Sequence, residues 1–247
     1  KTIKTKAKRL FLRWLFIRVS AFLYVGNLNY QFYRKYGIDK NRLFPMPYAV
    51  DNNHFQIQSQ KASKLREKLR ADLNLQSDRP IILYAAKLIS KKRPLDLLEA
   101  YKELSSNGEE PEPYLLFVGD GEQREKLEIE SKSTGWQSIR FLGFKNQSDM
   151  PAIYDLCDIF VLPSDFEPWG LAINEVMNTS KAVIVSDQVG CATDLVKPSC
   201  NGFIFPAYDV NKLAEILKQA LPFVESLGKQ SLKIIYKWSF SEGIEGL

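Results

Sequence analysis

Basic side chains are clustered at one point of the sequence, where they could bind an anion. Four of them stand just before a predicted helix that begins near residue 94: Lys87, Lys91, Lys92 and Arg93. Lysine and arginine beside the unsatisfied amides of a helix N-terminus attract phosphate, because both direct positive charge toward the same point. The cluster predicts a phosphate-binding loop, with a solvated run of basic residues as the alternative.

Two glutamates further along the chain are candidate site residues because of the elements predicted around them, since their spacing alone is not informative. Glu167 stands on a predicted turn between a strand and a helix, and Glu175 lies one to two turns later. Both carboxylates could therefore face one cleft and accept hydrogen bonds from ligand hydroxyls. Glu122 and Glu130 repeat the same spacing, on a predicted helix that is charged all round, and we interpret them as solvated surface.

Glycines and an aromatic residue follow two other predicted strands. Gly119, Asp120 and Gly121 form a turn in which the backbone can approach a planar group or a phosphate. The segment is not a dinucleotide fingerprint, because Arg124 stands where the third glycine would be. Phe144 follows the next strand, where a base could stack on it, although a strand end followed by a loop explains it equally well.

Residues for several other chemistries are missing from the sequence. His54 is the single histidine, and no acid or nucleophile follows it nearby, which leaves no candidate for a Ser-His-Asp or Cys-His arrangement. No Asp-x-Asp pair occurs. Cys157, Cys191 and Cys200 have the spacing of neither a disulfide framework nor a zinc site. We therefore expect no metal, no cofactor and a reducing, cytoplasmic setting.

Positive charge is confined to the start of the chain. The net charge is +5, but residues 1–38 hold nine basic and no acidic side chains, whereas residues 39–247 are net acidic. This distribution argues against nucleic-acid binding, which needs a basic face across the domain. Residues 10–28 are apolar but interrupted by Arg13 and Arg18, so they do not read as a membrane span.

Two interpretations of the basic start stay open. It could be an amphipathic helix on the inner face of an anionic membrane, giving peripheral contact through residues 1–38. The alternative is a helix of a packed domain whose other parts lie outside the sequence. The chain has no initiating Met, and we expect it to be an excised piece.

Short apolar runs alternate with helical patterns from residue 80 onward. Strands are predicted at 81–86, 114–119, 139–143, 158–164, 182–186 and 202–205, and helices at 94–105, 122–133, 150–156, 170–178, 193–196 and 209–221. A short βαβ-like passage precedes them, and Asp149 and Asp209 are predicted helix N-caps. The alternation predicts an α/β fold with a doubly wound, parallel, Rossmann-like sheet of about six strands. Ligands of such sheets bind beyond the carboxyl ends of the strands, where all the segments above lie.

Taken together, these segments resemble the donor-binding half of retaining glycosyltransferases with the GT-B fold, family 4. The matching pieces occur in the family's order over about residues 20–225: "PYAVDNNHF", "AAKLISKKRP", "LLFVGDGEQREKL", "IRFLGFKNQSDMPAIYDLCDIFVLPS", "FEPWGLAINEVM" and "NGFIFPAYDVNKLAEIL". The resemblance implies transfer of a glycosyl group from a UDP- or GDP-sugar, with retention at the anomeric carbon and without a metal. Another GT-B enzyme, such as a nucleotide-sugar epimerase, and a non-enzymatic nucleotide-binding or membrane-associating module stay as alternatives.

The resemblance also implies roles for individual residues. Lys87 and Lys92 would bind the pyrophosphate and, with Glu167, form the catalytic set; Lys87 replaces the family's commoner Arg and loses its bidentate fork. Glu175 would hold the ribose diol. The remaining donor-binding residues would be Gly119, Asp120, Gly121, Phe144, Trp169, Gly170 and Leu171.

The same resemblance implies a division of the chain. Residues 1–45 would be the remnant of an acceptor-binding domain, 46–79 a connector and lead-in, 80–225 the donor-binding domain and 226–247 a shortened C-terminal helical segment. The acceptor would be a carbohydrate or a lipid-linked sugar, typical of polysaccharide biosynthesis. With one domain incomplete, we expect this chain to bind donor but to transfer weakly or not at all.

Overall fold

The computed structural model describes residues 2–106, 112–133 and 137–245. Its strands are β1 (Phe22–Tyr24), β2 (Leu43–Pro45), β3 (Ile81–Ala85), β4 (Tyr114–Val118), β5 (Ile139–Gly143), β6 (Ile159–Leu162), β7 (Ala182–Ser186) and β8 (Gly202–Phe205). Its helices are α1 (Thr2–Ile17), α2 (Asn27–Lys35), α3 (Asn52–Ser63), α4 (Arg66–Asp72), α5 (Pro94–Ser106), α6 (Arg124–Ser133), α7 (Met150–Leu156), α8 (Leu171–Met177), α9 (Ala192–Leu195), α10 (Val210–Ala220), α11 (Val224–Ile235) and α12 (Phe240–Glu245), with short 3₁₀ turns at Lys40–Arg42, Ser90–Lys92 and Leu221–Phe223.

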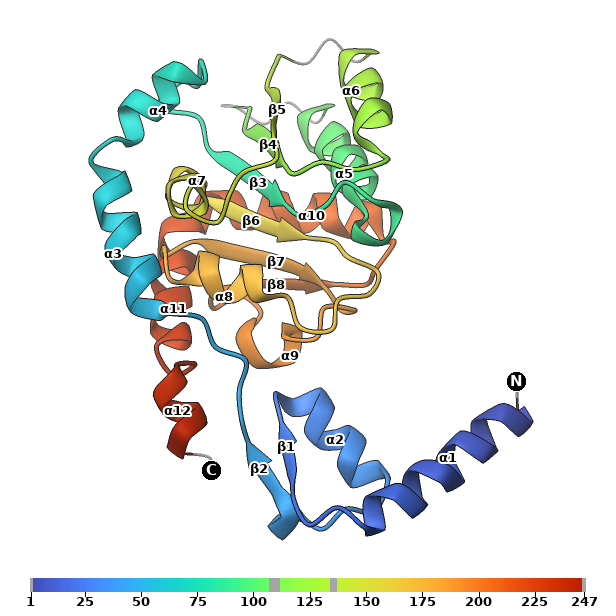
Figure 1. Ribbon diagram of the computed structural model, residues 1–247. Helices are drawn as coiled ribbons and strands as arrows, with labels where there is room; N and C mark the ends of the chain where they lie inside the picture. Colours follow the sequence, from blue (N-terminus) through green and yellow to red (C-terminus); the bar gives the residue numbers. More distant parts are fainter. Residues whose placement is uncertain (1, 107–111, 134–136, 246–247) are drawn as a thin grey trace.

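Strands β3 to β8 form one parallel sheet in the order β5-β4-β3-β6-β7-β8 (Figure 1). The predicted strands and helices beyond residue 80 agree with the structure to within two residues at each end. The chain winds outward from β3 to one edge and then from β6 to the other, so the direction of winding reverses between these two central strands. The predicted doubly wound α/β sheet is confirmed.

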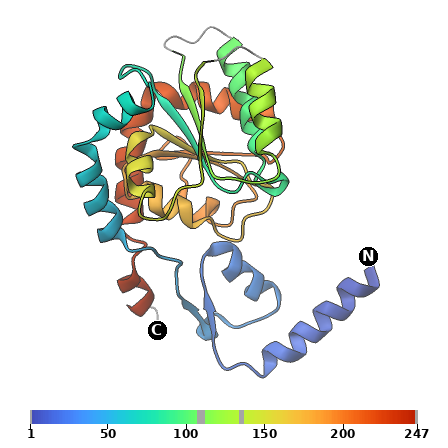
Figure 2. The same ribbon diagram turned by 45° about the horizontal axis from the view of Figure 1, so that its top comes forward.

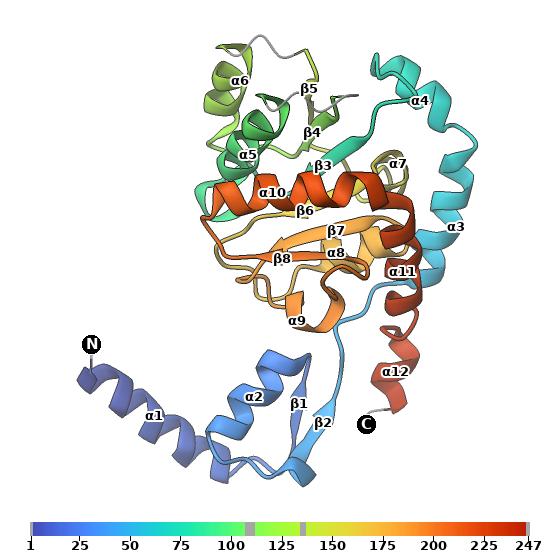
Figure 3. The ribbon, with the colours of Figure 1, turned by 180° about the vertical axis from the view of Figure 1, so that it is seen from behind.

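Alternate side chains of the central strands supply two separate cores. Leu83 and Phe160 point to the face covered by α7 and α8, whereas Tyr84 and Val161 point to the face covered by α5 and α10 (Figure 3). All four side chains are buried, as expected of strands with helices on both faces. The nearly continuous apolar runs in the sequence reflect this double burial.

The two predicted N-caps have different outcomes. Asp209 caps α10, because its carboxylate accepts a hydrogen bond from the amide of Lys212. Asp149 stands at the N-cap position of α7, but its side chain does not cap that helix. Its carboxylate instead accepts from the amide of Asn146 at 3.2 Å, so the prediction was wrong about the partner: the loop before α7 takes the hydrogen bond.

The predicted βαβ-like passage at the start of the chain forms a small unit. Strands β1 and β2 pair in parallel with α2 between them, over a core of Phe16, Phe22, Ile38 and Leu43. Figure 2 shows this unit beside the large sheet, with α1 extending away from both. Within the described residues, no helix combines the length and the apolar character needed to cross a membrane.

A carboxylate and a glycine join the small unit to the large sheet. The side chain of Asp194 in α9 accepts hydrogen bonds from the amide of Asn27 at 3.0 and 3.1 Å, at the start of α2. A negative charge at a helix N-terminus is stabilising. Beside it, a Cβ on Gly26 would fall 2.5 Å from the ring of Trp169, so a larger residue would force the two parts apart.

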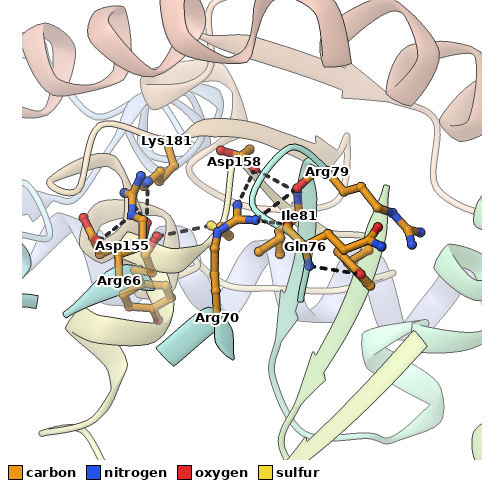
Figure 4. A network of polar contacts seen from close by, with 11 residues as sticks. Arg66, Arg70, Gln76, Arg79, Ile81, Asp155, Asp158 and Lys181 are labelled. Atoms are coloured by element: carbon orange, nitrogen blue, oxygen red, sulfur yellow. Dashed lines mark hydrogen bonds and ion pairs between the residues drawn. The ribbon is translucent and has the colours of Figure 1, made fainter. Parts of the chain in front are cut away.

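Helices α3 and α4 are fastened to the edge of the sheet where the strands begin. Figure 4 shows Arg66 and Lys181 converging on Asp155 at the end of α7. The Asp155 carboxylate accepts from Arg66 Nε at 2.9 Å and from the hydroxyls of Ser59 and Ser63 at 3.1 and 2.8 Å. Lys181 Nζ donates to the backbone carbonyl of Asp155 at 2.6 Å.

A second pair fixes the first residue of β3. The Asp158 carboxylate accepts from the amide of Ile81 at 2.8 Å, and Arg70 lies 3.9 Å from the same carboxylate. Arg70 also donates to the carbonyl of Gln76 at 2.6 Å, before the strand begins. Residues 46–79, predicted as a connector and lead-in, thus contain two helices that anchor the sheet.

We expect Asp155→Asn to lower the free energy of unfolding by about 2 kcal/mol, because it removes the charged acceptor of the partly buried Arg66 guanidinium. Burial raises the pKa of Asp155, but hydrogen bonds from Arg66 and Ser63 outweigh it and hold the pKa below its ordinary value. The stabilisation is therefore complete above the pKa of an unfolded Asp, about 4, and is lost as the pH falls below it.

Urea unfolding at pH 7 and at pH 3 would measure both effects. The difference between wild type and variant should shrink at pH 3. Glu225→Gln is the control, because its ion pair with Lys229 is exposed and should contribute little. A fully stable Asp155→Asn protein would contradict the anchoring role.

Candidate functional site

An ion pair joins the loops that follow the two central strands. Lys92, on the loop after β3, contacts the Glu167 carboxylate on the loop after β6 through its Nζ. Both side chains are partly buried. The two predicted site residues therefore meet, because β3 and β6 are neighbours and their carboxyl ends lie at one edge.

Further contacts hold these two loops together. The amide of Asp165 donates to the carbonyl of Lys91 at 3.1 Å, and the ammonium group of Lys91 lies 4.3 Å from the centroid of the Phe166 ring. Beneath the loop, the hydroxyl of the buried Tyr84 donates to the carbonyl of Lys87 at 2.9 Å. The backbone of the basic loop is thus fixed, whereas the Lys87 side chain remains exposed.

A cavity of about 430 Å³ opens over the carboxyl ends of β3, β4 and β5, and Lys87, on the same loop as Lys92, is part of its lining. Four predicted site residues line it: Lys87, Gly119, Asp120 and Phe144. Four apolar residues also line it, together with one lysine and one tyrosine that the sequence did not single out: Ala85, Ala86, Val118, Met150, Lys145 and Tyr154. Such a slot, largely apolar with a few charges at its rim, suits a flat heterocycle attached to an anionic group.

Gly119 and Gly121 bring the loop after β4 against the loop after β3. Their φ angles are +131° and +157°. A Cβ on Gly119 would lie 2.0 Å from the carbonyl oxygen of Ala86, and one on Gly121 would lie 2.5 Å from that of Leu88. The glycines are thus required by contact between two loops, and contact with a ligand stays a prediction for both.

Glu175 is held by a partner that sequence reasoning missed. The hydroxyl of Tyr154, on α7, donates to Glu175 Oε2 at 2.7 Å. Burial raises the pKa of Glu175, and the hydrogen bond from Tyr154 opposes that rise. Tyr154 also lines the 430 Å³ cavity, so it connects the carboxylate to that space. No local pattern marks Tyr154, because the contact joins two helices on one face of the sheet.

The turn between Glu167 and Glu175 has a glycine in the left-handed region. Gly170 has φ +100° and is the N-cap of α8, and Leu171 begins that helix with an exposed side chain. Trp169 is buried: its Nε1 donates to Asn174 at 2.9 Å, and its ring packs against Tyr48 and Trp238. The Trp169 side chain therefore packs between the small N-terminal unit and the large sheet. Its contact with a donor stays a prediction.

The second pair of glutamates does not line the 430 Å³ cavity. Glu130 is on α6 and forms ion pairs with Lys102 and Lys126. Glu122 precedes α6, contrary to its predicted place on the helix, and accepts from the amide of Ser90 at 3.4 Å. Over the described residues, no group of three or more His, Cys, Asp and Glu is arranged to hold a metal ion.

Comparison with known proteins gives a family and several relatives. The family described as Glycosyl transferases group 1 matches residues 65–225. An alpha-D-kanosaminyltransferase from Streptomyces kanamyceticus is 25% identical over 76% of this chain and 47% of that protein. The UDP-Gal:alpha-D-GlcNAc-diphosphoundecaprenol alpha-1,3-galactosyltransferase of Escherichia coli is 30% identical over 73% of this chain and 45% of that protein. The chain thus spans about half the length of these curated relatives.

Solved structures share the fold. A glycosyltransferase from Rickettsia africae ESF-5 has a TM-score of 0.79 at 19% identity, covering 97% of this chain and 64% of that one. Anabaena Alr3699/HepE, solved in complex with UDP, has a TM-score of 0.76 at 20% identity, covering 92% of this chain and 62% of that one. The architecture is that of GT-B glycosyltransferases.

We expect Tyr154→Phe to raise the pKa of Glu175, because the lost hydrogen bond stabilises the carboxylate. NMR titration of side-chain carboxyl carbons in glutamate-labelled protein would measure it. Tyr84→Phe is the control, since the Tyr84 hydroxyl donates to a backbone carbonyl and its loss should not change the pKa of Glu175. An unchanged or lower pKa of Glu175 in Tyr154→Phe would contradict the geometry.

Proposed function

Because this chain belongs to the glycosyl transferases group 1 family, we propose that it binds a nucleotide-diphosphate sugar and serves in transfer of its glycosyl group with retention of configuration. The observation that carries the proposal is the arrangement at the sheet edge. Lys87 and Tyr154 line the slot, and Tyr154 donates to Glu175. Lys92 lies on the same loop as Lys87 and pairs with Glu167. The slot, the cations and the carboxylate match the base, diphosphate and ribose of such a donor.

Each part of the donor has a proposed partner. The base would occupy the 430 Å³ cavity against Phe144, beside the loop of Gly119, Asp120 and Gly121. The ribose hydroxyls would donate to Glu175, whose carboxylate can accept two hydrogen bonds. The diphosphate would lie between the lysines and the amides at the start of α8, and the donor sugar would lie near Glu167.

The proposed chemistry follows the movement of charge. Cleavage of the bond between sugar and phosphate leaves a nucleoside diphosphate with added negative charge. Lys87 and Lys92, with the amides of Gly170 and Leu171, would stabilise that charge without a metal. The acceptor would attack from the face that the phosphate leaves, and the departing phosphate would take its proton. No side chain is assigned as general base.

We expect Lys92 and Glu167 to exchange partners when the donor binds. Without donor, each group neutralises the other. A diphosphate offers Lys92 a second anion, and the sugar hydroxyls offer Glu167 donors in place of part of the ammonium contact. The pair would therefore hold both side chains near their working positions before the donor arrives.

The acceptor side is a separate proposal, because the chain spans about half the length of its relatives. We assign residues 80–225 to donor binding, and the unit of residues 1–45 to the acceptor side. The acceptor would be a carbohydrate or a lipid-linked sugar, in keeping with the diphosphoundecaprenol acceptors named for two relatives. On this division, the 247-residue chain would bind donor and transfer it weakly.

One observation bears on a membrane contact. Helix α1 exposes Leu10, Phe11 and Trp14, and basic side chains flank them at Lys8 and Arg13. Large apolar side chains beside lysine and arginine suit the surface of an anionic bilayer. They also suit the surface of a further packed domain, and the vesicle experiment below separates the two interpretations.

A thermal-shift panel of UDP, GDP, ADP and NAD tests donor binding. At about 100 times Kd, the linkage free energy is about 2.7 kcal/mol, which should raise the melting temperature by roughly 5–10 °C. We expect one nucleoside diphosphate to give this shift and Glu175→Ala to lose it. Glu130→Ala is the matched control and should keep it. A shift that Glu175→Ala retains would contradict the assigned site.

Sedimentation with vesicles tests the membrane contact. If α1 lies on a bilayer, the chain should co-sediment with vesicles of phosphatidylglycerol and phosphatidylcholine and release at about 0.5 M salt. Replacing Trp14 and Phe11 with Ser should abolish binding. Vesicles of phosphatidylcholine alone are the control. Recovery of the chain in the supernatant at low salt would contradict the membrane contact and favour a domain surface.

A further inference from the structure

Two residues in an unfavourable backbone conformation touch each other across the carboxyl edge of the sheet. Arg93, after β3, has φ +53°, and Tyr208, after β8, has φ +72°. Residues with a Cβ rarely adopt this left-handed region, and a large aromatic side chain such as Tyr208 does so least often. Such a conformation persists only where other contacts impose it, and it often marks a functional position.

The side chains of these residues form a chain of contacts over three loops. The guanidinium of Arg93 lies 4.5 Å from the centroid of the Tyr208 ring. Two of its nitrogens, Nη2 and Nε, donate to the Asp96 carboxylate at 2.6 and 2.8 Å. The Tyr208 hydroxyl donates to Asp165 Oδ2 at 2.9 Å. The loops after β3, β6 and β8 are thereby linked through one tyrosine.

The linked residues are neighbours of the proposed donor site. Arg93 directly follows Lys92, and Asp165 lies two residues before Glu167. The amide of Asp165 also donates to the carbonyl of Lys91, so Asp165 binds Tyr208 through its carboxylate and the basic loop through its backbone. The position of Asp165 therefore affects both partners of the Lys92–Glu167 pair.

The Tyr208 side chain should contribute little to the free energy of folding. Its side chain is 59% exposed, and exposed polar contacts contribute little to the free energy of folding. A glycine or an asparagine would adopt the same backbone conformation at lower cost. The side chain is thus better explained by what it holds in place.

We propose that Tyr208 is a positioning residue of the donor site, acting through Asp165 and Arg93 on the loops that carry Lys92 and Glu167. The inference rests on the proposed function for its consequence, because the loops it fixes are those that would bind the donor. Tyr208 touches neither partner of the ion pair itself; its hydroxyl and ring restrict the motion of the loops.

The test compares wild type with Tyr208→Phe, which loses the hydroxyl, and Tyr208→Gly, which loses the side chain and relieves the backbone. Hydrogen–deuterium exchange over residues 87–93 and 163–170 measures loop motion without any ligand. Titration calorimetry with UDP and with GDP measures the donor site. Tyr236→Phe, an exposed tyrosine, and Ser199→Gly, at φ +60°, are the matched controls.

We expect exchange of both loops to quicken several-fold in the two Tyr208 variants, and Kd for the nucleotide that binds to rise about fivefold or more. Melting temperatures should stay within about 2 °C of wild type, or rise in Tyr208→Gly. The controls should change neither exchange nor affinity.

Three results would overturn the proposal: unchanged exchange, faster exchange with unchanged nucleotide affinity, or a large fall in melting temperature, which would show a role in global stability. If wild type binds neither UDP nor GDP, the proposed donor function fails for these nucleotides. The exchange result then decides on its own whether Tyr208 restrains the two loops.

Discussion

The ion pair between Lys92 and Glu167 depends on the winding of the sheet. The chain leaves β3 toward one edge and returns to β6 before it reaches the other, so the loops after these neighbouring strands have no helix between them. At this point the two loops approach closely enough for Lys92 and Glu167 to meet. The proposed chemistry uses that proximity, because one group faces a phosphate and the other a sugar.

The rest of the molecule supports this junction from two sides. At the edge where strands begin, Asp155 and Asp158 fasten α3, α4 and β3 through partly buried hydrogen bonds, which fixes the sheet. At the opposite edge, the contacts come from loops. A rigid scaffold that presents adaptable loops is the usual arrangement of a binding site. Asp194, which binds the start of α2, places the small N-terminal unit against this same edge.

Much of the fold could be predicted from the sequence, because strands buried on both faces are apolar throughout and several helices begin at recognisable N-cap residues. The residues after each strand could also be predicted as site candidates, since parallel strands bring their carboxyl ends together. Contacts between distant segments could not be predicted from any local pattern in the sequence. Tyr154 reaches Glu175 between two helices, Trp169 turns away toward Tyr48, and Tyr208 meets Asp165 from a loop 43 residues later. Each depends on side-chain packing that no spacing encodes.

A nucleoside diphosphate should bind at the edge formed by the loops after β3, β4 and β6, and a crystal structure of the chain with UDP or GDP would show whether it does. We expect the base in the 430 Å³ cavity, the ribose hydroxyls on Glu175 and the diphosphate beside Lys87 and Lys92. A nucleotide bound elsewhere, for example in the 550 Å³ cavity between the small unit and Trp238, would contradict the assigned site.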